Sequence, residues 1–154
     1  MIELKRILVP TDFSEPSAAA VKYAKEFAEA FGASLHVLHV LEDPLVFAPM
    51  SEGYATPPNF YEELEKNARD RLAAVVSAAE LPTPQTRVTL TKGSPFVEIV
   101  RYAKSEDIDL IVMGTHGRGP MAHMLMGSVA EKVVRKAPCP VLTVRHPEHE
   151  FVMP

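Results

Sequence analysis

The sequence contains a single cysteine, Cys139, among its 154 residues. One thiol cannot form an intrachain disulfide, and it cannot build a cysteine-based metal site. The sequence also has no excess of basic residues, because it contains 16 Lys and Arg and 20 Asp and Glu, which gives a net charge of −4. We therefore expect neither nucleic acid nor an anionic membrane as a partner, since both are attracted by a basic field.

Long apolar runs are also absent. The first one, Ile7–Val9, is too short for the hydrophobic region of a signal peptide, and Pro10 ends it. No run approaches the roughly 20 residues that a membrane-spanning helix needs. Apolar residues make up 47% and charged residues 23%, a balance typical of globular proteins. The sequence thus predicts one cytoplasmic domain, residues 1–146, followed by a loose tail, residues 147–154.

Hydrophobic periodicity predicts five strands that alternate with four helices. The expected strands are residues 5–9, 34–41, 86–91, 108–113 and 141–144. The first and third expected helices begin after the N-cap residues Ser14 and Ser94. The second expected helix spans residues 60–81, and the fourth begins at residues 127–128 and ends at residue 136. Strict alternation predicts an α/β fold: a parallel sheet with right-handed crossovers and helices on both faces. Residues 42–58 form a long proline-containing loop, which is typical of a lid or a partly disordered segment.

Ligands of such sheets bind beyond the carboxyl ends of the strands, where the strand order reverses. A glycine-rich segment follows the fourth expected strand, and Gly127 and Ser128 then stand where the next helix starts. Glycines allow positive φ and a close backbone approach, and free N–H groups at a helix N-terminus favour a phosphate. Ser128 and Arg118 could add donors. An alternative interpretation, a flexible loop with an ordinary serine cap, remains open.

Asp12 lies just past the first expected strand. Its carboxylate could accept hydrogen bonds from an adenine amino group or from ribose hydroxyls. The alternative is a turn or cap residue before the first helix, and local chemistry alone favours this alternative. His36 and His39 are three residues apart on an expected strand, so they point to opposite faces and do not form a shared metal site.

Four separated stretches resemble the universal stress protein A superfamily. They are residues 7–14, Gly93–Pro95 with the following Glu98 and Ile99, residues 109–119, and residues 138–142. ATP-binding members carry Gly, two residues, Gly, nine residues, Gly, and then Ser or Thr. This spacing is matched by Gly114, Gly117, Gly127 and Ser128. The sequence has no G-x-x-x-x-G-K-[ST] loop of the P-loop ATPases.

The resemblance implies a Rossmann-like five-stranded sheet in the order 3-2-1-4-5. It places adenine near Asp12 and Val40, flanked by Pro10 and Thr11, with Met113 lining the pocket. It implies that the phosphates contact Gly114, Gly117, Gly127, Ser128 and Val129. We extend this set of phosphate contacts to Ala130 and Arg118. It also implies a homodimer through the last strand, which consists of Val141, Leu142, Thr143 and Val144.

The resemblance favours an ATP-binding regulatory module of the stress response. Two alternatives stay open: a slow Mg- or Mn-dependent ATPase or phosphotransferase, and a stress protein that acts through protein surfaces without a nucleotide. We assign no catalytic and no metal-ligating residue, because only His116 could be recruited as a base near the glycine segment. Mg or Mn would enter with the phosphates of ATP.

Overall fold

The computed structural model describes residues 1–44, 57–82, 85–116 and 126–145. Within these ranges the elements are, in chain order, β1 (Arg6–Pro10), α1 (Glu15–Phe31), β2 (Ser34–Leu41), α2 (Phe60–Ala78), β3 (Thr86–Lys92), α3 (Pro95–Ser105), β4 (Leu110–Gly114), α4 (Ser128–Lys136) and β5 (Val141–Val144). The strands form one parallel sheet in the order β3-β2-β1-β4-β5. The predicted fold class and strand order are confirmed. Most of the expected loop 42–58 and the whole tail 147–154 lie outside the described residues.

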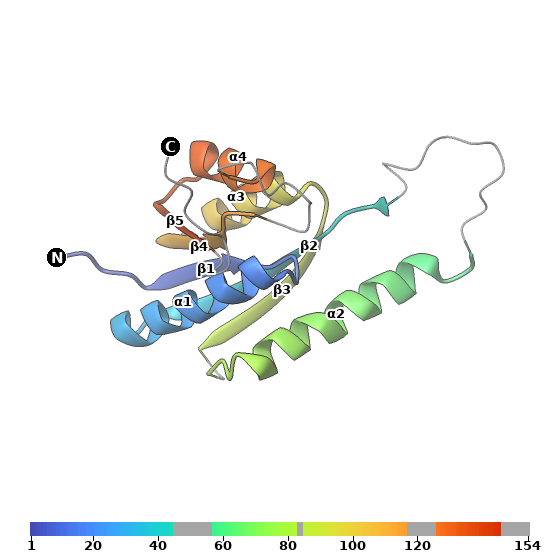
Figure 1. Ribbon diagram of the computed structural model, residues 1–154, viewed down its shortest axis with the longest axis horizontal. Helices are drawn as coiled ribbons and strands as arrows, with labels where there is room; N and C mark the ends of the chain where they lie inside the picture. Colours follow the sequence, from blue (N-terminus) through green and yellow to red (C-terminus); the bar gives the residue numbers. More distant parts are fainter. Residues whose placement is uncertain (45–56, 83–84, 117–125, 146–154) are drawn as a thin grey trace.

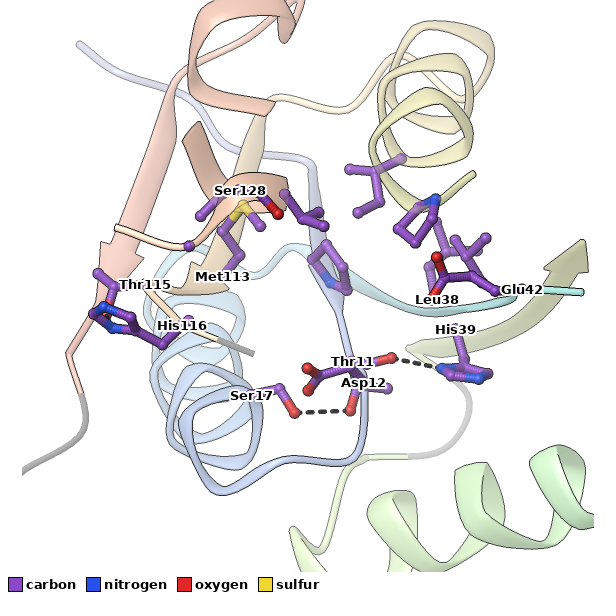
Figure 2. Close-up of a pocket in the computed structure, with 18 residues that line it drawn as sticks. Thr11, Asp12, Ser17, Leu38, His39, Glu42, Met113, Thr115, His116 and Ser128 are labelled. Carbon is purple, nitrogen blue, oxygen red and sulfur yellow. Dashed lines mark hydrogen bonds between the residues drawn. The ribbon is translucent and has the colours of Figure 1, made fainter. Parts of the chain in front are cut away.

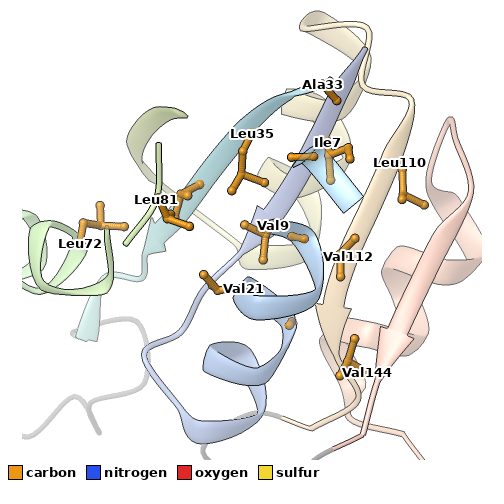
Figure 3. Close-up of a cluster of buried hydrophobic side chains, with 14 residues drawn as sticks. Ile7, Val9, Val21, Ala33, Leu35, Leu72, Leu81, Leu110, Val112 and Val144 are labelled. Carbon is orange, nitrogen blue, oxygen red and sulfur yellow. The ribbon is translucent and has the colours of Figure 1, made fainter. Parts of the chain in front are cut away.

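Two helices cover each face of the sheet (Figure 1). Helices α1 and α2 pack on one face around a cluster that includes Ile7, Val9 and Leu35, and Figure 3 shows this cluster. Helices α3 and α4 pack on the other face around Leu8 and Leu38. Successive residues of a strand point to opposite faces, so the continuous apolar run of β1 supplies both cores.

The ends of α1 follow the sequence signals. The Ser14 side chain accepts a hydrogen bond from the Ser17 backbone N–H, as a helix N-cap does. Gly32 ends the helix in the left-handed conformation, with φ of 65°. Ser94 occupies the N-cap position of α3, but its side chain makes no capping hydrogen bond, so the expected cap is only positional.

Several predicted boundaries are wrong. Strand β1 spans Arg6–Pro10 instead of residues 5–9, and strands β3 and β4 each end one residue later than predicted. Two boundaries differ by more than one residue. Helix α2 ends at Ala78 instead of residue 81, because Glu80 takes a positive φ of 50° and the Leu81 N–H turns back to the Val76 carbonyl. Strand β4 begins at Leu110 instead of residue 108. The reason is that Asp109 first uses its carboxylate to accept the backbone N–H groups of Lys5 and Arg6, both at 2.8 Å.

The strand order reverses between β1 and β4. Strand β1 pairs with both β2 and β4. The chain continues from β1 through α1 to β2 on one side, and from β4 through α4 to β5 on the other side. The carboxyl ends of β1 and β4 therefore flank the position where ligands bind in sheets of this kind. In the described ranges, none of the helices has the length and apolar character needed to cross a membrane.

Candidate functional site

A pocket of about 420 Å³ opens at the reversal point (Figure 2). This volume falls within the roughly 300–1,000 Å³ of small-molecule sites. The carboxyl ends of β1, β2 and β4 and the first turns of α1, α3 and α4 form its walls. The lining residues are Pro10, Thr11, Asp12, Ser17, Leu38, His39, Val40, Glu42, Pro95, Ile99, Met113, Gly114, Thr115, His116, Gly127, Ser128, Val129 and Ala130.

The structure brings ten of the twelve candidate residues around this one pocket. They are Pro10, Thr11, Asp12, Val40, Met113, Gly114, Gly127, Ser128, Val129 and Ala130. The other two, Gly117 and Arg118, lie outside the described residues. Eight further lining residues were not among the twelve candidates. His116 had been considered only as a base that could be recruited, and sequence reasoning missed the other seven: Ser17, Leu38, His39, Glu42, Pro95, Ile99 and Thr115. Leu38 could have been found from Val40, because residues two apart on a strand share a face.

The N-terminus of α4 opens into the pocket without a side-chain cap. Gly127 is the N-cap and has no side chain to offer, and the first helical bond runs from the Glu131 N–H to the Gly127 carbonyl. The N–H groups of Ser128, Val129 and Ala130 therefore have no acceptor within the helix. All three residues line the pocket, so they present donors and the positive end of the helix dipole to it.

Gly127 itself ties α4 to the end of β4. Its N–H donates to the Thr115 carbonyl at 2.6 Å. Its backbone is extended, with φ of −67° and ψ of 156°, so the positive φ that we expected a glycine to supply is not used here. Glycine at this position leaves no side chain beside the α4 N-terminus.

Gly114 is explained by packing inside the protein. A Cβ at this position would lie 2.9 Å from the carbonyl carbon of Pro16 in the first turn of α1. Real Cβ atoms do not approach a backbone so closely, so any other residue would push α1 away from β4. The sequence pattern had suggested a close approach to a ligand, whereas the structure shows a close approach to a helix.

The Asp12 carboxylate takes part in the turn after β1. Its Oδ1 accepts the Ser14 backbone N–H at 3.0 Å and also contacts the Ser14 hydroxyl. The alternative role as a turn residue is thus realised. Asp12 is nevertheless half-buried and lines the pocket, so the turn leaves it beside a potential ligand (Figure 2).

Buried hydroxyls brace the same turn. The Thr11 and Ser17 hydroxyls lie 3.1 Å apart, and both side chains are buried. The Ser17 hydroxyl donates to the Ser14 carbonyl, and the Phe13 N–H donates to Thr11 Oγ1. Since buried polar groups are costly unless they are hydrogen-bonded, this network holds the base of the pocket in one arrangement.

Histidines near the pocket are engaged by the protein. His116 places its Nδ1 3.0 Å from the Thr115 hydroxyl. His39 places its Nδ1 2.7 Å from the Thr11 carbonyl, while His36, on the opposite face of β2, bonds the Tyr102 hydroxyl. The expectation that His36 and His39 share no metal site agrees with this geometry. Across the described ranges, no group of three His, Cys, Asp or Glu residues could hold a metal ion.

Proteins of known family resemble this chain over nearly its full length. A universal stress protein of Methanocaldococcus jannaschii is 35% identical over 147 residues, covering 95% of this chain and 85% of the relative. The structure of the universal stress protein UspA from Lactobacillus plantarum superposes with a TM-score of 0.72 at 30% identity. That match covers 94% of this chain and all of the other.

Two similar solved structures hold a nucleotide. One is a universal stress protein in complex with cAMP, with a TM-score of 0.61, 26% identity, and coverage of 93% of this chain and 98% of that one. The other, from Archaeoglobus fulgidus, is in complex with dAMP, with a TM-score of 0.62, 25% identity, and the same coverage. The model of the universal stress protein family matches residues 3–145. This chain belongs to the universal stress protein family.

Proposed function

We propose that this protein binds ATP, or a close adenine nucleotide, in the pocket between β1 and β4. The observation that carries the proposal is the open N-terminus of α4, where Ser128, Val129 and Ala130 line the pocket and their N–H groups have no acceptor within the helix. Such a terminus stabilises an anion through hydrogen bonds and the helix dipole. The net charge of −4 supplies no attraction of its own, so these local donors must hold the phosphates.

The apolar part of the pocket lining suits an adenine ring. Leu38, Val40, Ile99 and Met113 are buried apolar residues that line the pocket. Asp12 lines the same pocket with a carboxylate that can accept a hydrogen bond from an amino group or a ribose hydroxyl. An apolar cavity with a few polar groups at its edge is the usual composition of a small-molecule site.

Related structures support an adenine nucleotide as the ligand class, since one similar protein holds cAMP and another holds dAMP. The choice of a triphosphate rests on the spacing of Gly114, Gly117, Gly127 and Ser128, which matches the ATP-binding members. Mg or Mn would then enter with the phosphates, because the described residues offer no metal cluster of their own.

We further propose that the protein acts as a regulatory module of the stress response and not as an efficient ATPase. The ground is that the sequence offers only His116 as a candidate base near the glycine segment. A second copy is the proposed partner, through β5. This strand pairs only with β4 among the described strands, and Val141, Leu142 and Thr143 are half-buried at the sheet edge. Apolar edge strands of this kind are usually covered.

The test is calorimetric titration of the purified protein with ATP, with and without Mg²⁺, after mass spectrometry for co-purified nucleotide. Micromolar binding or trapped nucleotide would support the proposal. Absence of both would leave the fold intact and move the function to the protein surface. A phosphate-release assay on the same sample separates a binding module from an ATPase, and size-exclusion chromatography with light scattering tests the dimer.

A further inference from the structure

Three side chains from separate elements stack beside the turn that carries Asp12. The rings of Phe13 and His39 have centroids 4.2 Å apart and are tilted by 36°. The guanidinium carbon of Arg71, on α2, lies 4.3 Å from the Phe13 ring centroid, which is a cation–π distance. The stack therefore connects β2 and α2 to the turn after β1.

His39 also holds the backbone of this turn. Its Nδ1 lies 2.7 Å from the Thr11 carbonyl oxygen, and Figure 2 shows this bond as a dashed line. A carbonyl can only accept, so Nδ1 carries the proton. The Thr11 N–H donates in turn to the Leu38 carbonyl at 2.8 Å. Strand β2 thus binds both backbone groups of Thr11.

This arrangement decides where the next N–H points. In a planar trans peptide the C=O and the following N–H point in opposite directions. Because the Thr11 carbonyl points to His39 on β2, the Asp12 N–H points away from β2, toward the β4 side of β1, where the pocket opens. No acceptor for the Asp12 N–H is found in the described part of the chain. Asp12 can therefore offer a ligand a backbone donor as well as a carboxylate.

Phe13 needs outside support to keep this geometry. Its φ of 66° lies in the left-handed region, which bulky residues avoid. Such a conformation persists only where the surroundings impose it. Here the Phe13 N–H is bound by Thr11 Oγ1 at 3.1 Å, and its ring contacts His39 and Arg71. Loss of these contacts would free the turn to relax and would move Asp12.

We propose that His39 and Phe13 are positioning residues for Asp12, reinforced by Arg71, and that they set the affinity for the adenosine part of the ligand. The inference rests on the proposed nucleotide function of the pocket. The proposed phosphate site is the N-terminus of α4, which packs on the other face of the sheet from Phe13 and α2, so we expect phosphate binding not to depend on the stack.

The test compares calorimetric titrations with ATP and with inorganic tripolyphosphate. We expect His39→Leu to weaken ATP binding by about tenfold, because the variant loses the hydrogen bond that orients the Thr11–Asp12 peptide. Tripolyphosphate binding stays within about twofold of wild type on the same scale. His39→Asn places an amide N–H near the position of Nδ1 and restores most of the ATP affinity. ATP binding by His39→Leu at wild-type strength, or the absence of rescue by Asn, would overturn the inference.

Arg71→Ala supplies a second variant that cannot disturb the core, because Arg71 is exposed. We expect it to weaken ATP binding by about two- to fivefold, the usual worth of an exposed cation–π contact. Arg69→Ala is the matched control: Arg69 lies on the same helix but pairs with Glu65 at 2.7 Å. Equal affinities for the two variants would contradict the role of the stack.

A failure of the proposed function is distinguishable from a failure of this inference. Wild-type protein that binds neither ATP nor tripolyphosphate contradicts the function. The ligand-free protein still tests the orienting bond, because ¹⁵N NMR reports which ring nitrogen of His39 carries the proton. A proton on Nδ1 supports the inference, and an unprotonated Nδ1 overturns it.

Discussion

The two ends of the sheet both carry pockets with polar groups, but these groups are used differently. At the amino ends, a depression of about 360 Å³ is lined by Arg6, Ser34, His36, Gln85, Arg87, Ser105, Glu106 and Asp107. Arg87 pairs with Glu106 at 2.7 Å, Arg6 pairs with Asp107 at 3.6 Å, and His36 bonds Tyr102. The polar groups of this end therefore bind one another.

At the carboxyl ends, the protein leaves donors for something else. Three N–H groups of α4 and the N–H of Asp12 face the pocket region without an acceptor among the described residues. Buried or half-buried donors normally have partners, so a set of open ones gathered beside an apolar cavity indicates a ligand. A polar depression by itself does not distinguish a ligand site from a structural network, whereas the hydrogen bonds of its groups do.

The largest expected effect is at the carboxyl end, with Gly127→Val. Valine accepts the extended backbone of this position, with φ of −67° and ψ of 156°, so we expect the fold to be kept. Its side chain would stand beside the α4 N-terminus and weaken ATP binding at least about a hundredfold, or ~2.7 kcal/mol. Circular dichroism checks the fold and calorimetry the affinity. If the folded variant binds ATP as wild type does, the phosphates lie elsewhere.

A second variant separates the two roles of glycine in the motif. Gly114→Ala would place a Cβ 2.9 Å from the Pro16 carbonyl carbon, so α1 must shift. We expect the free energy of unfolding to fall by about 1–3 kcal/mol, the usual cost of overpacking. Urea denaturation measures it. An unchanged midpoint would show that α1 moves freely and that Gly114 serves the ligand instead.

The amino end predicts a pH dependence of stability. Burial, followed by the charge of Arg87, lowers the pKa of His36 below its usual 6.5, although Glu106 opposes the shift. Between pH 6.5 and the lowered pKa, the unfolded chain binds a proton that the folded protein does not. The contribution of His36 to stability is therefore complete above pH 6.5 and is lost as the pH falls through the lowered pKa.

The slope of this loss is at most about 1.4 kcal/mol per pH unit. His36→Asn keeps a polar group near Tyr102 but does not titrate, so we expect a flatter dependence of the unfolding free energy on pH. Denaturation series at several pH values between neutral and mildly acidic conditions measure both proteins. Identical slopes for the two would show that His36 is not responsible.

The smallest expected effect is at the amino ends of the sheet, with Arg87→Ala. Arg87→Ala removes the ion pair with Glu106, whose partners are 60% and 30% exposed. Exposed pairs are worth about 0–1 kcal/mol, so we expect a change of that size in stability and no change in ATP affinity. A clear loss of ATP affinity in calorimetry would mean that the amino end is coupled to the pocket.

Much of the architecture could be predicted because it depends on local signals. Strands 34–41 and 141–144 were predicted to the residue, since each is an apolar run bounded by breakers. The boundary of β4 could not be predicted, because Asp109 is drawn to the backbone of Lys5 and Arg6, which are remote in sequence.

The sequence by itself determined the order of the elements and the glycine spacing, because periodicity and turn chemistry are local properties. The strand order, and with it the residues expected at the reversal point, followed from the resemblance to a known family. Only the tertiary structure decided what those residues do. It shows Gly114 against Pro16, the Gly127 N–H bound to Thr115, and His39 bound to Thr11. These contacts join residues from different elements. Their distances depend on how the helices and strands pack, and the sequence pattern alone does not give this packing.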